Sequence, residues 1–440
     1  MKLSIYTHLF CRDGKWYLYN SETGFFSTLH ESAYEALYNG DFEILGEETV
    51  QILREKRIIV DEEHLYDYYY ASRLSYLSTI GYQKSLNLTI APTTGCNFAC
   101  PYCFEGEKGN KVMSQDTIND LIAFINSYEE SDTLNITWYG GEPLCAFGTI
   151  KEILKRIEND CRCKIGSQSI VTNGYLINEE IIDFMKRTHF NSIQISLDGT
   201  EKHHNETRFV KGSKNPTFER IMDNLDLLAG KMPKSFCISL RINVNKNNED
   251  DYANMYKFIR EKYPDKDNIV VYPGFIREPN KSGSAMCYKC LFGNDRYAFW
   301  LKAVKQGVPD SLYPQKTAKG CMTSQNNSLV IGPEGEIYKC WNDVNHPEKV
   351  VGYIKDKRMT NPQLICHYAF EATLFNDPKC KNCKLFPICD GGCGWMRYEN
   401  VINGKEYDIC SYLSNINNLE ECLLNYSQTQ ENVIAKQPIC

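Results

Sequence analysis

The sequence predicts an α/β protein built on an open, partial (β/α)6 barrel of the TIM type. From residue 86 onward, six short apolar runs typical of strands alternate with amphipathic stretches typical of helices. Strands joined through helices run parallel, because a parallel pair needs a crossover connection. The chain has 440 residues, which is enough for two or three domains and a sizeable core.

Residues 1–80 precede the barrel and are predicted to form a small α+β domain. A turn at Asp13-Gly14 indicates a hairpin, and helices are expected at 31–38 and 47–56. Residues 61–80 are expected to form a linking helix whose tyrosines pack. This content is compatible with a winged-helix-like fold. The alternative is an extension that only packs on the barrel.

The barrel elements follow from the hydrophobic pattern and the turn residues between them. Strands are predicted at 86–91, 134–139, 169–172, 192–197, 238–244 and 269–272. Helices are predicted at 117–127, 150–158, 179–187, 218–228 and 252–263, the first of them capped by Ser114.

Three cysteines follow the first predicted barrel strand. Residues 94–104 read Thr-Gly-Cys-Asn-Phe-Ala-Cys-Pro-Tyr-Cys-Phe, which spaces Cys96, Cys100 and Cys103 as C-x3-C-x2-C. A four-iron cluster normally has four thiolate ligands, so three cysteines leave one iron open for chemistry. A closed zinc site would need four ligands. We expect an iron–sulfur cluster at the carboxyl end of this strand, where the sites of such barrels lie.

This motif resembles that of the radical S-adenosylmethionine (radical SAM) superfamily. The resemblance implies that the open iron chelates the amine and carboxylate of S-adenosylmethionine (SAM), whose reductive cleavage yields a 5′-deoxyadenosyl radical. Trp138-Tyr-Gly-Gly-Glu-Pro-Leu, after the second strand, supports it. Gly140 and Gly141 would let a ligand approach the backbone, and Glu142 would supply an acceptor. The resemblance assigns Gly141 and Glu142 to the methionyl ammonium.

Two further strand ends carry polar groups suited to ribose and carboxylate binding. They are Thr172 with Asn173 after the third strand, and Ser196 with Asp198 after the fourth. The resemblance places Ser196 around the carboxylate and ribose of the cofactor.

Two more residues are assigned through the same resemblance. Arg208, whose planar fork matches a carboxylate, would bind beside the cofactor, and Tyr102 would pack by its adenine. His203 and His204 are expected to be solvated loop residues.

A second group of cysteines resembles the SPASM extension of this superfamily, which holds auxiliary four-iron clusters. Its pattern is Cys-x13-Gly-x4-Cys, then C-x2-C-x5-C-x3-C, then one more cysteine. The residues are Cys321, Cys340, Cys380, Cys383, Cys389, Cys393 and Cys410. Zinc ribbons are the alternative. The tail beyond residue 412 is expected to fray.

The resemblance divides these seven cysteines between two auxiliary clusters. Cys380, Cys383, Cys389 and Cys410 would complete an outer cluster, which leaves Cys321, Cys340 and Cys393 for an inner one. Full ligation of two clusters needs eight thiolates. The inner cluster is therefore expected to keep one open iron, or to be closed by Cys287, Cys290 or Cys366.

Composition narrows the class of protein further. The net charge of -7, from 49 basic and 56 acidic residues, gives no electrostatic case for nucleic-acid binding. No apolar run is long enough for a membrane span, and the N-terminus lacks a secretory h-region, so we expect a cytoplasmic protein without membrane partners. The 20 cysteines then indicate iron sites rather than disulfides.

We therefore expect a radical SAM/SPASM peptide maturase with SAM and three 4Fe-4S clusters. Residues 1–80 would recognise a peptide, 81–310 form the radical SAM barrel, and 311–440 hold the auxiliary clusters and the tail. The substrate would be a ribosomally made precursor peptide or a protein, which acquires a thioether or another cross-link. Flavodoxin or ferredoxin would be the reductant.

Two rival functions stay open. The first is sulfatase maturation, which forms formylglycine. That family carries an Asp directly after the second SPASM cysteine, where this chain has Trp341, and it typically lacks so long an N-terminal segment. The second is a non-catalytic electron carrier or peptide-binding scaffold. The intact Gly141-Glu142 pair and the three cluster cysteines argue against it.

Overall fold

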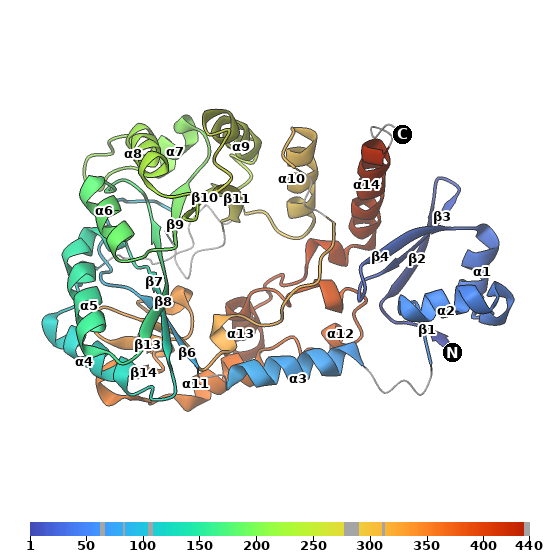
Figure 1. Cartoon of the computed structure of the whole chain (residues 1–440), viewed down its shortest axis with the longest axis horizontal. Helices are drawn as coiled ribbons and strands as arrows, with labels where there is room; N and C mark the ends of the chain where they lie inside the picture. The colour runs from blue at the N-terminus through green and yellow to red at the C-terminus, as the bar shows by residue number, and fades with distance from the viewer. Residues whose placement is uncertain (62–66, 82–83, 104–108, 277–289, 310–312, 435–440) are drawn as a thin grey trace.

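The computed structural model of the chain describes residues 1–61, 67–81, 84–103, 109–276, 290–309 and 313–434. Its centre is a ten-stranded sheet in the order β11-β10-β9-β8-β7-β6-β12-β13-β14-β15 (Figure 1). The predicted barrel strands are β6 (Ser85–Ile90), β7 (Thr133–Trp138), β8 (Lys164–Thr172), β9 (Ser192–Leu197), β10 (Cys237–Val244) and β11 (Ile269–Phe275). Neighbours among these six pair in parallel. The predicted α/β class with a parallel core is confirmed.

Helices cover the outer face of the six parallel strands (Figure 1). They are α4 (Gln115–Asn126), α5 (Phe147–Asp160), α6 (Glu179–Arg187), α7 (Glu201–Thr207), α8 (Phe218–Lys231) and α9 (Asp251–Lys262). Ser114 caps α4 as predicted, because its Oγ accepts a hydrogen bond from the Thr117 amide at 3.1 Å. The short helix α7 was not predicted.

The sheet is wider than predicted, because the C-terminal part of the chain adds strands to it. β12 (Ser328–Ile331) pairs in parallel with β6, so it forms a seventh parallel strand. β13 (Glu336–Tyr338), β14 (Gly352–Tyr353) and β15 (Arg358–Met359) continue from it in antiparallel fashion. These short strands lack the length and alternation that mark a strand in sequence.

Residues 1–60 form the predicted small α+β unit. β2 (Thr7–Arg12), β3 (Lys15–Asn20) and β4 (Phe25–Leu29) make a three-stranded antiparallel sheet. Its helices are α1 (Glu31–Asn39) and α2 (Glu47–Glu55), and β1 (Lys2–Leu3) pairs with β5 (Ile59–Val60). The predicted hairpin at Asp13-Gly14 is confirmed, and α1 ends at Gly40 with φ of 83°.

Several contacts attach the N-terminal part to the C-terminal part, and two of them are apolar clusters. Tyr17 and Tyr19 of β3 belong to one apolar cluster with Leu419 and Leu423 of α14 (Ile416–Ile434), which lies beside this sheet in Figure 1. The linking helix α3 (Tyr68–Ile80) runs along the C-terminal segments. The N-terminal part is therefore packed on the rest of the chain rather than free of it.

The expectation of a frayed tail is wrong for residues 416–434, which form α14. Burial of Leu419 and Leu423 against the N-terminal sheet stabilises this helix, a contact that sequence pattern does not reveal. Residues 435–440 lie outside the described residues. Across the described part of the chain, no helix combines the length and apolar character needed to cross a membrane.

Candidate active site

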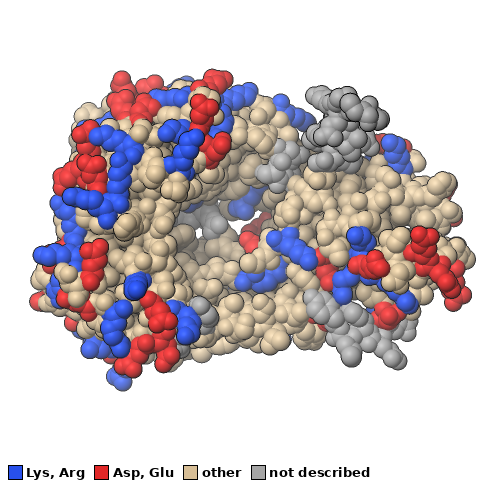
Figure 2. Space-filling model, viewed as in Figure 1, with Lys and Arg blue, Asp and Glu red and all other residues tan. Residues whose placement is uncertain are grey.

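A cavity of about 300 Å³ lies at the carboxyl ends of the barrel strands. All three cysteines of the first motif line it, as do eight of the nine residues predicted to contact the cofactor; these eight are Tyr102, Gly140, Gly141, Glu142, Thr172, Asn173, Ser196 and Arg208. Trp341, Asn342 and Trp395 close it from the C-terminal segments. In the space-filling view the surface is hollowed between the barrel and these segments, with Lys and Arg side chains at the rim (Figure 2).

The two glycines after β7 allow the backbone of the cysteine loop to pack closely against them. A Cβ on Gly140 would collide with the Thr93 carbonyl oxygen, and one on Gly141 with the carbonyl oxygens of Thr94 and Gly95. The Glu142 amide donates to the Gly95 carbonyl at 2.9 Å. The sequence interpretation, that these glycines admit a ligand, was therefore incomplete. What approaches them most closely is the backbone of the cysteine loop.

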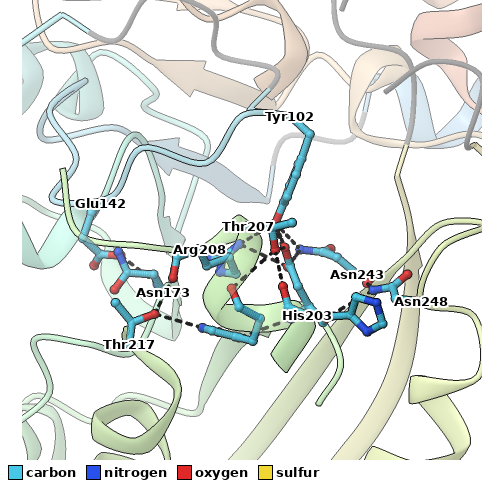
Figure 3. Close-up of polar contacts among 11 residues, drawn as sticks. Tyr102, Glu142, Asn173, His203, Thr207, Arg208, Thr217, Asn243 and Asn248 are labelled. Carbon is cyan, nitrogen blue, oxygen red and sulfur yellow. Dashed lines mark hydrogen bonds and ion pairs between the residues drawn. The ribbon is translucent and has the colours of Figure 1, made fainter. Parts of the chain in front are cut away.

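Glu142 is fully buried, and the protein already satisfies its carboxylate. Oε1 accepts from Thr172 Oγ1 at 2.7 Å and from the Leu144 amide at 3.0 Å, while Oε2 accepts from the Asn173 amide at 2.7 Å. Burial raises the pKa of this carboxyl, and these hydrogen bonds oppose the rise. Glu142 thus joins the ends of β7 and β8, and Figure 3 shows it against Asn173.

A polar network lies beside the cysteine loop (Figure 3). The Tyr102 hydroxyl donates to Asp198 at 2.5–2.6 Å and accepts from Arg208 at 3.0 Å. Asp198 also accepts from Thr207 Oγ1 at 2.6 Å and from Asn243 Nδ2 at 3.0 Å, and it lies 3.6 Å from the Arg208 guanidinium. Asp198 is the one predicted contact that does not line the cavity. Its carboxylate holds Tyr102 and Arg208 in place from behind.

Two donors beside this network have no hydrogen-bond partner among the described residues. Arg208 Nε and Asn97 Nδ2 are buried and make no hydrogen bond. Because an unsatisfied buried donor costs about 1–3 kcal/mol, both atoms suit a ligand that carries acceptor oxygens.

The expectation that His203 and His204 are solvated loop residues is wrong, because both lie in α7. His204 is fully buried. Its Nε2 bonds Thr217 Oγ1 at 3.1 Å, and the Asp198 amide donates to its Nδ1 at 3.4 Å. His203 is partly exposed and pairs with Asp251 at 2.6 Å.

Several cavity residues were missed by sequence reasoning, including Gln194, Arg241 and Asn243. The sequence does carry a signal for them, because apolar and polar residues alternate along β9 and β10. Ile193, Ile195 and Leu197 on β9 are buried in the apolar core, and Ile238, Leu240 and Ile242 on β10 are buried with them. The polar residues between them therefore face inward. A polar inner face marks a barrel that holds a ligand rather than a packed core.

The C-terminal cysteines fall into two spatial groups. Burial raises the pKa of the Cys340 thiol well above its usual value, with Asp343, Cys393 and Cys321 adding to the rise, so these three cysteines are neighbours. In the same way Cys380 interacts with Cys389, and Cys383 interacts with both Cys389 and Cys410. These interactions are compatible with the division that the family resemblance implied, and the ligation of two auxiliary clusters stays a prediction.

The arrangement of the cysteines fits a four-iron cluster better than a single metal ion. No three His, Cys, Asp or Glu side chains among the described residues converge closely enough for a single ion. A four-iron cluster spreads its thiolates over four corners and demands less convergence. Arg397 donates to Cys380 Sγ at 3.3 Å, and Lys319 Nζ donates to the Cys389 carbonyl at 2.6 Å. These cations suit an anionic cluster on the outer group.

Two of the three candidates for an eighth ligand lie in the described part of the chain. Cys290 is buried near Lys246, and Cys366 is exposed on α11 (Pro362–Cys366). Cys287 lies outside the described residues.

Comparison with known proteins identifies the barrel. Residues 90–259 match the Radical SAM superfamily, a region that begins at the end of β6 and includes all three cysteines of the first motif. The chain contains a radical SAM domain. The predicted resemblance to this superfamily is thereby confirmed.

Known proteins resemble this chain in sequence or fold over most of its length. The radical SAM domain and its surroundings are 27% identical over 353 residues to the cysteine-type anaerobic sulfatase-maturating enzyme of Clostridium novyi, which covers 74% of this chain and 92% of that protein. The structure of native anSMEcpe with bound AdoMet and Cp18Cys peptide matches with a TM-score of 0.61 and 22% identity over 80% of this chain and 99% of that one. Streptococcus suis SuiB bound to S-adenosylmethionine matches with a TM-score of 0.50 and 16% identity over 89% and 95%. The protein is related to the sulfatase-maturating enzymes, and the structural matches share its fold.

Proposed function

We propose that this protein is a radical SAM enzyme that modifies a peptide or protein side chain. Its cofactors would be SAM, a 4Fe-4S cluster on Cys96, Cys100 and Cys103, and two auxiliary 4Fe-4S clusters in residues 311–440. Bound together, SAM and the first cluster would supply a 5′-deoxyadenosyl radical. The single observation that carries the proposal is one cavity lined by all three motif cysteines and by the glycines of the second motif.

The residues around the cavity would divide the work of holding SAM. Arg208, with its unpaired Nε, would bind the cofactor carboxylate. Asp198 would position Arg208 and Tyr102 from outside the cavity wall. The carbonyl oxygens near Gly141, rather than the satisfied carboxylate of Glu142, would be free to accept from the methionyl ammonium. Burial of the network excludes water from these groups.

The peptide substrate is supported by relationship and by chain architecture. The anSMEcpe structure that matches this chain contains bound Cp18Cys peptide. Residues 1–80 would capture the peptide, residues 81–310 would carry the radical site, and an iron–sulfur or flavin protein such as ferredoxin or flavodoxin would deliver electrons.

We favour a cross-link, such as a thioether, over formylglycine because Trp341 stands where sulfatase maturases carry an acid. Glu142 is the only carboxylate among the described residues that line the cavity, and three donors occupy it. In sulfatase maturases an acid follows the second SPASM cysteine. In this chain that position is Trp341, which stacks on Tyr139 with ring centroids 5.4 Å apart.

Formylglycine formation is the second candidate, because the similarity to sulfatase-maturating enzymes extends over 74% of the chain. Mass spectrometry of peptides encoded beside the gene, after co-expression, separates the two. A loss of two hydrogens per cross-link supports our proposal. An aldehyde at a sulfatase-type motif supports the alternative.

The radical site itself is tested by replacing Cys96, Cys100 and Cys103 together with Ala. We expect 5′-deoxyadenosine production from SAM and dithionite to fall below detection, while the iron of the C-terminal groups is retained. The two cysteine groups belong to separate segments, so one can lose its iron without the other. Continued 5′-deoxyadenosine formation by the triple variant would refute the assignment of these cysteines. Absence of 5′-deoxyadenosine from the reduced, unmodified protein would instead favour the electron-carrier alternative.

A further inference from the structure

Arg241 presents an unpaired positive charge to the cavity. It stands on β10 and lines the cavity wall. Its Nε is buried without a hydrogen bond, and within the described residues its guanidinium has no ion-pair partner. The side chain as a whole is partly exposed to the cavity, so its guanidinium is open to an anion from outside the chain.

The fold makes room for this side chain. Gly274 on β11 faces Arg241, and a Cβ on Gly274 would collide with Arg241 Nε and approach its Cγ to 2.9 Å. A glycine inside a strand often marks such a close approach. Arg241 is paired in register with Ser196 on β9 and with Tyr272 on β11. The Arg241 guanidinium is therefore placed at the height of Ser196 and Tyr272 along the barrel strands.

The described part of the cavity wall offers Arg241 no ion-pair partner. Glu142 is the only carboxylate among the described lining residues, and it accepts hydrogen bonds from Thr172, Leu144 and Asn173. Asp198 is taken up by Tyr102, Thr207, Asn243 and Arg208 behind the wall. A planar guanidinium matches a carboxylate in a bidentate pair.

Bonding partners distinguish Arg241 from Arg208, the arginine that we assign to SAM. Arg208 is held by Tyr102 and Asp198, which fix it beside the cysteine loop. Arg241 lies two residues before Asn243 on β10, and Asn243 also reaches Tyr102 and Asp198, so both arginines belong to the same side of the cavity. Arg241 has no such partner among the described residues, which leaves it available to a second ligand.

We propose that Arg241 binds a carboxylate of the peptide substrate and so selects acidic peptides. The carboxylate is an Asp or Glu side chain or the free C-terminus. This inference rests on the proposed function, because it requires the cavity to receive a peptide. It adds a specificity-determining residue and a substrate class.

The experiment is a binding selection that needs no turnover. Random twelve-residue peptides are displayed with an amidated or a free C-terminus and captured on the iron-loaded, SAM-bound enzyme. We expect Asp or Glu at a fixed position to be enriched about tenfold, or free C-termini to be recovered about tenfold over amidated ones. Arg241→Gln should abolish the preference, and Arg241→Lys should retain part of it.

Two further variants test position as distinct from charge. Gly274→Ala keeps every charge but displaces the Arg241 side chain, so it should also lower the preference for acidic peptides several-fold. Arg220→Gln is the matched control. Its guanidinium lies over the Tyr175 ring, 4.4 Å from the centroid and outside the cavity lining, and its loss should leave the preference intact. If Arg241→Gln does not fold, Gly274→Ala and Arg241→Lys decide by the same selections.

Three results would overturn the proposal. One is equal recovery of acidic and neutral peptides by the unmodified enzyme. Another is an acidic preference that survives Arg241→Gln. The third is a loss of SAM affinity in Arg241→Gln as large as the loss of peptide preference, which would assign Arg241 to the cofactor. Failure of the unmodified enzyme to form 5′-deoxyadenosine would instead refute the proposed function, which this selection does not measure.

Discussion

His204 shows at the scale of one residue how a buried side chain outside the cavity supports its wall. Its ring bonds the Asp198 amide and Thr217 Oγ1, and Thr217 Oγ1 in turn donates to the Arg208 carbonyl at 2.6 Å. Burial, aided by the nearby Arg208 charge, lowers the pKa of His204 well below its usual value. The residue therefore stays neutral in the folded protein.

This lowered pKa gives a pH-dependent stability. Above pH 6.5 neither state protonates His204, so its contribution is fully present. Below pH 6.5 the unfolded chain takes up a proton that the folded chain does not, and stability falls by up to about 1.4 kcal/mol per pH unit. We expect His204→Gln to reduce this slope between pH 6.5 and 5. Urea unfolding at several pH values measures it, and identical slopes in the two proteins would contradict the prediction.

At the scale of elements, α3 fixes the N-terminal part to the C-terminal segments through two tyrosines. The Tyr69 hydroxyl donates to the Phe375 carbonyl and the Tyr76 hydroxyl to the Ala369 carbonyl, each at 2.6 Å. Both rings are buried, whereas Tyr70 on the same helix is 52% exposed. Packing was expected of Tyr66, Tyr68, Tyr69 and Tyr70. It is confirmed for Tyr69 and wrong for Tyr70, Tyr66 lies outside the described residues, and Tyr76 packs although it was not among those named.

We expect Tyr69→Phe and Tyr76→Phe each to lower the free energy of unfolding by about 1 kcal/mol, because each removes one buried hydrogen bond. Tyr76→Ala should cost about 3–5 kcal/mol, since it also leaves a cavity. Tyr70→Phe is the matched control, with an expected change below about 0.5 kcal/mol. Chemical denaturation measures all four. If Tyr70→Phe were as destabilising as Tyr76→Phe, the result would contradict our claim that the buried hydroxyls stabilise the fold.

At the scale of the whole molecule, the proposed peptide-capture role of the N-terminal unit predicts the effect of its removal. Because α3 is part of the C-terminal packing, the informative truncation begins at Asp67 rather than after α3. We expect this chain to keep its iron and its 5′-deoxyadenosine production without peptide, because the N-terminal unit contributes no residue to the described cavity lining. Its dissociation constant for the precursor peptide should rise at least tenfold.

Iron analysis and circular dichroism establish that the shortened chain is folded, which matters because it exposes Leu419 and Leu423 of α14. A folded truncated chain that binds and modifies the full-length peptide as well as the parent would show that the N-terminal unit only packs on the barrel.

The sequence by itself determined the features that depend on short spacings. The three cysteines in C-x3-C-x2-C, the Gly-Gly-Glu after β7 and the alternation of strands and helices from residue 86 are local patterns. A local pattern constrains the same few residues in any compact arrangement of the chain. The parallel α/β core and the relationship to radical SAM enzymes could therefore be predicted.

Only the tertiary structure decided how distant residues combine. It turned Asp198 away from the cavity and onto Tyr102, buried His204, and added β12 to the barrel sheet. It also left Arg241 facing Gly274 without an ion-pair partner among the described residues. Each outcome depends on which of several possible partners lies within about 3 Å, and hydrogen bonds and contacts act only at that range. Residues tens of positions apart reach it only once the whole chain has packed.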